Sequence, residues 1–458
     1  MPYEGEFAEY RSIRRLTENE RVKNLLQRAK ERDINQDKTS LPILQRSEIQ
    51  PSKWQPELVL AVDGSHQPVQ VEKGYPGSEV GYVTVAAVLM DIAKIRELDR
   101  QRPVDPKAFR ATEKAGSIDS AFPGCNIVID SERSPVASLR KALFETFMET
   151  RIFSDGETLL DTYEVLLGYK AQETQNCPYG DNCLSSANKF TIKQGSYRCD
   201  CSQQNMLYST DALRIHEGMI PDSSNGAMFA EIMQTLERVL VIHVLRWFEQ
   251  KELLSLLRDT AIVVDGPLAI FGHPAGLLQA IIKEIRRINQ TAKGFTDGAG
   301  ILLIGVEKSG FFVNHFERID QNKDGSIGVF APQAVALLTD DYIKKNIIFS
   351  DGKKSYGQET YFGRKFFYKT LSGARIVASL PLLEKSHEDA TRADPDQYPR
   401  LADALALLDQ LASSRFPNAL SPLISANAEA AIPMNLGSRV LEEMAKKLIK
   451  QRRGENGL

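Results

Sequence analysis

The sequence lacks several features that would assign the protein to a common class. No apolar run among its 458 residues approaches the length that spans a bilayer. The first residues, Met1 to Glu6, have neither the basic region nor the apolar core of a secretion signal, so we expect a cytoplasmic protein without membrane contact. There is no P-loop, no G-x-G-x-x-G fingerprint and no Ser-His-Asp arrangement. NTPase, dinucleotide-binding and serine hydrolase functions therefore have no support.

The sequence also lacks an excess of positive charge. Its 57 lysines and arginines are matched by 60 aspartates and glutamates, which gives a net charge of −3. A protein that coats nucleic acid nonspecifically is usually basic, so this class is disfavoured. A nuclease is not excluded, because a metal-dependent active site concentrates acidic residues and DNA contacts can be confined to a local groove.

Two apolar segments, about two hundred residues apart, end in the same dipeptide. Leu58–Ser65 and Ala261–Pro267 contain β-branched runs that predict buried strands, and each run stops at Asp-Gly. We therefore expect Asp63 and Asp265 to lie side by side at one edge of an α/β sheet. Adjacent carboxylates repel each other unless a cation lies between them. One Asp-Gly is ordinary turn chemistry, but two matched copies favour a divalent metal site and phosphodiester hydrolysis.

A two-metal site needs a third carboxylate, and a long helix is predicted from Asn225 to Lys251, before the second Asp-Gly strand. A crossover helix runs antiparallel to the strand that follows it. A strand of five residues is about 16 Å tall, and a helix covers that height in about 11 residues. Glu237 therefore lies near the height of the carboxyl end of the strand. Glu231, a turn and a half earlier, stays open as the alternative.

One lysine stands at a position where it can meet a phosphate. Lys308 follows the predicted strand Ile301–Val306. A lysine there interacts with a phosphate as a point charge. An exposed lysine without a function is the competing interpretation, and the residues alone leave the two even.

Four of the five cysteines lie in a polar segment at about residues 170–205. They are Cys177, Cys183, Cys199 and Cys201. Four thiols this close in a cytosolic chain favour a tetrahedral zinc site over disulfides. The first spacing is longer than usual and the last is shorter, so the match is irregular. We expect structural Zn²⁺, with a loop of reduced thiols as the alternative.

Taken together, these motifs resemble those of the NurA nuclease family. The matching segments are, in order, Ala61–Ser65, Met233–Glu237, Val263–Leu268 and Ile304–Ser309. The family's C-terminal part is matched by the strands around Phe367-Tyr368 and Arg375 and by the segment from Phe416-Pro417 to Ile432. Each motif is weak alone, but their order and combination are fairly specific.

The resemblance implies a fold and a division of the chain. The implied fold is α/β, an RNase H-like mixed sheet flanked by helices, with the Cys-rich segment as an insertion. Residues 1–55 are then an N-terminal helical segment, 56–434 the NurA-like nuclease domain, and 435–458 a basic C-terminal helix.

The resemblance also implies an activity. The family's activity is Mn²⁺- or Mg²⁺-dependent DNA cleavage, as an exonuclease and a single-strand endonuclease. Its members are homodimers docked on a HerA-type hexameric ATPase, and they act in DNA repair through end resection or, in some bacteria, in phage defence. Carried over to this chain, Asp63, Glu237 and Asp265 would ligate the metal and Lys308 would lie beside the phosphate.

One position departs from the family pattern. The last family motif usually contains a histidine, whereas the corresponding stretch here has Asn427. Asparagine can ligate a metal or hydrogen-bond a phosphate, but it cannot shuttle a proton near neutral pH. Two alternatives therefore stay open beside the DNA nuclease. One is a non-catalytic adaptor that binds a translocase or DNA ends, and the other is an RNA-directed nuclease that uses the same carboxylates.

Overall fold

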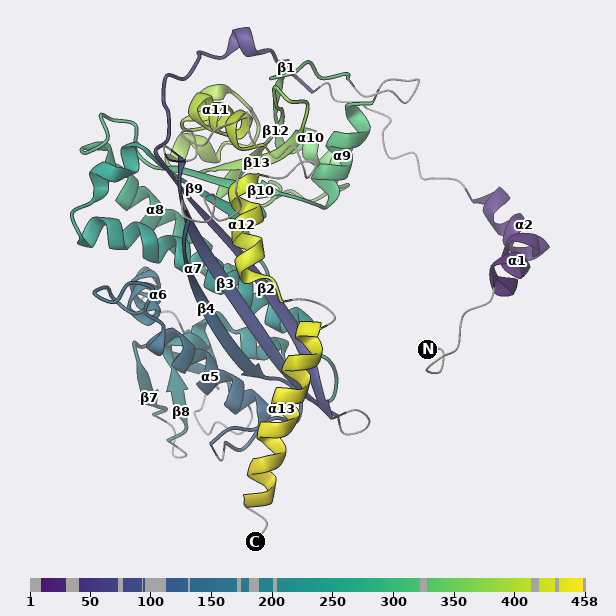
Figure 1. The fold of residues 1–458 in the computed structure, drawn as a ribbon, viewed down its shortest axis with the longest axis vertical. Coiled ribbons are helices and arrows are strands. Elements are labelled where there is room, and N and C mark those ends of the chain that lie inside the picture. Colours follow the sequence, from purple (N-terminus) through teal and green to yellow (C-terminus); the bar gives the residue numbers. More distant parts are fainter. Residues whose placement is uncertain are drawn as a thin grey trace.

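A computed structural model describes residues 10–29, 41–72, 77–92, 94, 113–130, 132–170, 174–180, 189–200, 204–321, 328–412, 420–432 and 436–455 (Figure 1). Within these residues the centre of the fold is a nine-stranded mixed sheet with the order β1-β11-β12-β13-β10-β9-β2-β3-β4. Its strands are β1 (Ile43–Leu44), β2 (Leu58–Glu72), β3 (Ser78–Asp91), β4 (Glu113–Pro123), β9 (Thr260–Asp265), β10 (Leu302–Glu307), β11 (Val335–Leu337), β12 (Gly363–Lys369) and β13 (Arg375–Pro381). The predicted mixed sheet is confirmed.

Strand directions divide the sheet into an antiparallel part and a parallel part. β2, β3 and β4 form an antiparallel meander, and β2, β9 and β10 are parallel neighbours. The first Asp-Gly strand, β2, pairs antiparallel with the next strand, β3, over nearly its whole length. The prediction that this strand stops at Asp63-Gly64 is wrong. β2 continues to Glu72 because β3 remains paired with it, whereas its pairing with β9 ends at Val62.

Helices cover both faces of the sheet, and the side-chain alternation of the strands decides which residues face them. Val62 and Val264 belong to a core cluster shared with the helices α5 (Pro135–Glu149), α6 (Leu159–Gly168), α7 (Gly226–Gln250) and α8 (Leu278–Lys293). Ala61 and Val263 face the opposite core, which includes α11 (Leu401–Leu411) and α12 (Ser421–Ala430). β2 and β9 are therefore buried on both faces, which explains why apolar and polar residues do not alternate along their runs.

The long helix predicted from Asn225 to Lys251 is confirmed as α7, and it has 25 residues. It packs against β2 and β3 and has no proline or glycine after its first residue, so nothing in its sequence breaks it. The 3-10 turn η5 (Leu254–Arg258) follows it and leads into β9. The α7 helix is therefore continuous across one face of the sheet and can present side chains to more than one strand.

Peripheral elements complete the fold. The helices α1 (Arg11–Glu18) and α2 (Glu20–Arg28) bury none of their residues. α13 (Leu436–Glu455) lies along the far end of the β2–β3 arms (Figure 1), where Ala445 contacts Val71 and Val80. The remaining short helices are η1 (Arg46–Glu48), η3 (Ser209–Leu213), η4 (Ile215–Gly218), η6 (His273–Leu277), α9 (Phe311–Ile319), α10 (Asp340–Tyr342), η7 (Ile343–Ile347), η8 (Lys385–Glu388) and η9 (Pro395–Gln397).

The segment predicted as a Cys-rich insertion folds into two small antiparallel sheets. One pairs β5 (Thr174–Asn176) with β6 (Lys189–Thr191), and the other pairs β7 (Ser196–Arg198) with β8 (Met206–Tyr208). In the part of the chain that the structure describes, no helix is both long enough and apolar enough to cross a membrane.

We predict that Gly305→Ala will destabilise the fold at the junction of β9 and β10. A Cβ at Gly305 would lie 2.8 Å from the Gly266 carbonyl oxygen and 2.8 Å from the Leu268 amide nitrogen, and backbone atoms cannot move away cheaply. Overpacking of this kind costs about 1–3 kcal/mol, so thermal unfolding should occur at a lower temperature. Gly116→Ala, on β4, is the matched control because its Cβ would meet nothing within 4 Å. Equal melting temperatures for the two variants would contradict the prediction.

Candidate active site

The two Asp-Gly aspartates lie on adjacent strands. β2 and β9 pair in parallel up to Val62 and Val264, and the next residues are Asp63 and Asp265. Both aspartates project to the same face of the sheet because side chains alternate along a strand. Asp63 is 2% exposed, and its Oδ1 accepts a hydrogen bond from the Gly64 amide at 2.8 Å. Two carboxylates from distant parts of the sequence are therefore neighbours in the sheet.

Glu237, on helix α7, lies against β2 at Gly64, the residue after Asp63, and the missing side chain of Gly64 makes this approach possible. A Cβ at Gly64 would lie 2.7 Å from Glu237 Oε1 and 2.8 Å from Met233 Cγ. Any side chain at this position would therefore collide with the glutamate and with the helix that carries it. The backbone of Gly64 is extended and not left-handed, so this glycine serves close approach and not a turn. The glutamate is itself 4% exposed.

Lys308 lies between the two aspartates. Its Nζ is 2.9 Å from Asp63 Oδ2 and 3.1 Å from Asp265 Oδ1. Of the two interpretations that the sequence leaves even, the geometry favours a lysine that belongs to the site. We name the four residues Asp63, Glu237, Asp265 and Lys308 the carboxylate cluster.

Burial and mutual repulsion shift the pKa values of side chains in the carboxylate cluster. Burial raises the pKa of Asp63 to about 6, with repulsion from Asp265 added and attraction by Lys308 opposing it. Burial also raises the pKa of Glu237 to about 8, again with repulsion from both aspartates. Burial lowers the pKa of Lys308, but the two aspartates more than offset this effect and its pKa is raised. The carboxylates therefore strongly favour a nearby positive charge.

The residues present fit a divalent cation. Three carboxylates are the donors that Mg²⁺ and Mn²⁺ prefer. Asp265 Oδ1 is buried and makes no hydrogen bond, although it lies close to the Lys308 ammonium. In the described ranges no three acidic, histidine or cysteine side chains are spaced as a ready-made ligand group. The two aspartates instead share the ammonium of Lys308.

Glu231, the alternative third carboxylate, has a different partner. Its Oε2 is 2.9 Å from His273 Nδ1 in the loop after β9. Glu237, by contrast, interacts electrostatically with Asp63 and Asp265. The geometry therefore favours Glu237 as the third member of the site.

One site residue escaped the sequence analysis. Arg238 follows Glu237 on α7 and is 3% exposed, and its guanidinium donates to the carbonyl oxygens of Asp265, Pro267 and Ala269. The available signal was an arginine beside a glutamate in an apolar helix, where a charged side chain needs a specific partner. The partners are backbone atoms, which no sequence motif identifies.

The other predicted positions are only partly described. Cys177 and Cys199 are both buried and belong to the core cluster beneath the helices, whereas Cys183 and Cys201 lie outside the described residues. Asn427 is exposed on α12, the helix that packs against β2, β3 and β9. Phe416-Pro417 also lies outside the described residues.

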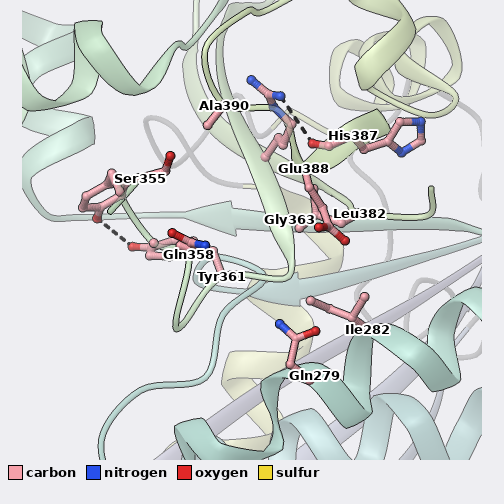
Figure 2. Close-up of a pocket in the computed structure, with 13 residues that line it drawn as sticks. Gln279, Ile282, Ser355, Gln358, Tyr361, Gly363, Leu382, His387, Glu388 and Ala390 are labelled. Atoms are coloured by element: carbon pink, nitrogen blue, oxygen red, sulfur yellow. Dashed lines mark hydrogen bonds between the residues drawn. The ribbon is translucent and has the colours of Figure 1, made fainter. Parts of the chain in front are cut away.

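A separate cavity of about 220 Å³ lies between α8 and the segments that precede β12 and follow β13. Figure 2 shows Gln279, from α8, facing Gln358 and Tyr361 across it. Arg364 also lines the cavity, but each of its Nη atoms donates to two backbone carbonyl oxygens. This guanidinium is therefore already used by the fold and is not available to a ligand in the cavity.

A mixed α/β sheet that carries buried carboxylates and a lysine is typical of metal-dependent nucleases. The family model of the NurA domain matches residues 57–414, which is most of the chain. The chain therefore belongs to the NurA nuclease family, and the resemblance found in the sequence is confirmed. Among solved structures, the crystal structure of the NurA nuclease from Sulfolobus solfataricus is similar over 98% of this chain and 98% of that chain, with 11% identity and a TM-score of 0.34. A comparison with curated proteins gives no match.

We predict that Glu237→Gln will stabilise the metal-free protein at alkaline pH. The pKa of Glu237 rises from 4.5 to about 8 on folding, so the folded state binds the proton more tightly than the unfolded chain. Stability is then full below about pH 4.5 and falls as the pH rises towards 8. A neutral glutamine avoids this loss. In EDTA at about pH 8.5, the melting temperature of the variant should exceed that of the wild type by about 2 °C or more.

The control for this prediction is Glu231→Gln on the same helix. Glu231 is paired with His273, so removing its charge should bring no gain at about pH 8.5. The advantage of Glu237→Gln should also vanish near pH 5, where the wild-type glutamate is protonated. A gain that is independent of pH would contradict the assignment of this stability loss to the Glu237 charge.

Proposed function

We propose that the protein is a metal-dependent DNA nuclease whose active site is the carboxylate cluster. Asp63, Glu237 and Asp265 would hold Mn²⁺ or Mg²⁺, and Lys308 would lie beside the scissile phosphate. The observation that carries the proposal is that β2, α7 and β9 bring two buried carboxylates and a partly exposed one into electrostatic contact, with Lys308 against the aspartates and Arg238 against Glu237.

The chemistry follows from the residue types. Bound divalent cations polarise a phosphodiester and lower the pKa of a water that attacks it in line. The three carboxylates must be ionised to bind such cations, so binding releases the protons that Asp63 and Glu237 hold below about pH 6 and pH 8. Lys308 then contributes a point charge for a phosphate oxygen. The buried setting strengthens each of these interactions relative to water.

Family membership supports finer proposals that reach beyond the cluster. We propose an RNase H-like core formed by β4, β3, β2, β9 and β10, and both exonuclease and single-strand endonuclease activity. We further propose a cytoplasmic homodimer that works with a HerA-type hexameric ATPase in DNA end processing or phage defence. These proposals rest on the match to the NurA domain and on the resemblance of the motifs.

A catalytically inactive adaptor of the same fold is the second candidate. The observation that favours it is the exposed Asn427 on α12, at the position where the family usually has a histidine. Such an adaptor would bind DNA ends or a translocase without cutting. The same cleavage assay separates the two candidates, and a matched set of RNA substrates tests the RNA-directed alternative.

We predict that Asp265→Asn will abolish cleavage of labelled single- and double-stranded DNA. The wild type should cut with Mn²⁺ or Mg²⁺ and not with EDTA, because the neutral amide in the variant no longer provides a charged metal ligand. Asp259→Asn, at the opposite end of β9, is the matched control and should cut like the wild type. The Asp265→Asn variant should melt at the same temperature as the wild type in EDTA.

Two outcomes would count against the nuclease proposal. Equal cleavage by the wild type and Asp265→Asn would move the chemistry away from the carboxylate cluster. No cleavage by either protein, also in the presence of a HerA-type ATPase, would favour the adaptor.

We also propose a structural Zn²⁺ bound by Cys177, Cys183, Cys199 and Cys201. Cys177 and Cys199 are buried in one core cluster, which brings one cysteine from each half of the spacing pattern into the interior. The purified protein should contain about one zinc per chain, and Cys177→Ser should lose it, as measured by elemental analysis. Cys125→Ser is the control, since Cys125 lies outside the four-cysteine spacing. Wild-type protein without zinc would refute this site.

A further inference from the structure

The guanidinium of Arg238 is held in an unusual arrangement beside the carboxylate cluster. Its Nε donates to the Ala269 carbonyl oxygen at 2.9 Å, and its Nη2 donates to the carbonyl oxygens of Asp265 and Pro267 at 3.2 Å each. The remaining nitrogen, Nη1, is buried and has no hydrogen-bond partner. It lies 3.6 Å from Glu237 Oε2. One side chain therefore contacts both the loop after Asp265 and the carboxylate of Glu237.

These contacts connect two metal-ligand candidates that belong to different elements. Glu237 stands on α7, whereas Asp265 ends β9 and its chain turns away at Gly266, which has a φ of 75°. A turn held only by its own backbone can shift by fractions of an ångström. Three bonds from one planar, rigid donor to the carbonyls of Asp265, Pro267 and Ala269 remove that freedom.

Other bonds fix the same loop, but none of them reaches Glu237. The Gly266 amide donates to the Val306 carbonyl oxygen at 2.8 Å, and the Leu268 amide donates to Ser379 Oγ at 3.1 Å. Those bonds join the loop to β10 and β13, and the Phe271 amide joins it to α7 through Gln234 Oε1 at 2.7 Å. Arg238 differs from these contacts because its guanidinium meets both the Asp265 carbonyl oxygen and the carboxylate of Glu237.

We propose that Arg238 is a positioning residue that aligns Glu237 with Asp265 for binding a divalent cation. The proposal rests on the metal site of the proposed function. Its structural basis is the set of three carbonyl bonds together with the contact between Nη1 and Glu237. Outer-shell residues of this kind orient the ligands, and their substitution typically weakens metal binding about 10- to 100-fold.

The test compares metal binding by two arginine variants of the full-length protein without DNA. Arg238→Lys keeps the positive charge and removes the planar fork, so a change in affinity reports geometry and not charge. Arg364→Lys is the matched control, because Arg364 is also buried and also donates to backbone carbonyls, away from the carboxylates. Binding of Mn²⁺ is followed by the electron paramagnetic resonance signal of the free ion, and stability by thermal unfolding in EDTA.

The proposal expects both variants to lose stability, but only Arg238→Lys to bind Mn²⁺ about 10- to 100-fold more weakly. Unchanged Mn²⁺ affinity in a folded Arg238→Lys would overturn it, since Arg238 would then be a loop clamp like Arg364. Equal losses of affinity in both variants would overturn it as well. Wild-type protein that binds no Mn²⁺ would instead refute the metal site of the proposed function.

If Arg238→Lys does not fold, Arg238→Gln replaces it in the Mn²⁺-binding measurement. Removal of a positive charge from the neighbourhood of a cation site, taken alone, strengthens cation binding. Weaker Mn²⁺ binding by Arg238→Gln therefore runs against the charge effect and supports positioning. Equal or tighter binding would contradict it.

Discussion

Mutual repulsion among three neighbouring carboxylates, two of them buried, is the constraint on which this structure depends. Asp63 and Glu237 have almost no contact with solvent, and each raises the free energy of the other's charge. Such an arrangement persists only where the surrounding fold holds the groups in place. The protein meets this need with two flanking cores and with two cations, Lys308 and Arg238. The cations act differently, because the lysine touches the aspartate oxygens whereas the arginine holds backbone carbonyls.

The two Asp-Gly motifs are alike in sequence and different in structure. Gly266 has a left-handed backbone, so it turns the chain out of β9 immediately after Asp265. Gly64 stays within the extended strand β2, and its missing side chain leaves room for Glu237. The same dipeptide therefore solves a conformational problem at one site and a packing problem at the other. Both glycines allow the carboxylates of the cluster to lie close together.

Much of the sheet and most of the cluster could be predicted from the sequence, for reasons that can be stated for particular residues. Apolar β-branched runs identified the strands of Asp63 and Asp265. The height of a strand, measured back along the predicted helix, selected Glu237 as the third carboxylate. The prediction that β2 ends at Asp63 failed because pairing with β3 continues where pairing with β9 stops. Arg238 was not predicted, because its partners are carbonyl oxygens that every residue possesses. Long-range pairing and backbone partners carry no local signal.

The order of Glu237 and Arg238 along α7 explains how one helix can contribute to the carboxylate cluster and also brace the loop beside it. Consecutive helical residues point about 100° apart, given 3.6 residues per turn. The glutamate can therefore face the gap at Gly64 while the arginine faces the neighbouring loop, and neither needs a bend in the helix. A rigid helix keeps these two side chains in a fixed relative position, whereas a loop would not. The 25-residue length and deep burial of α7 are then part of the site, because a shorter or frayed helix would let the two side chains drift apart.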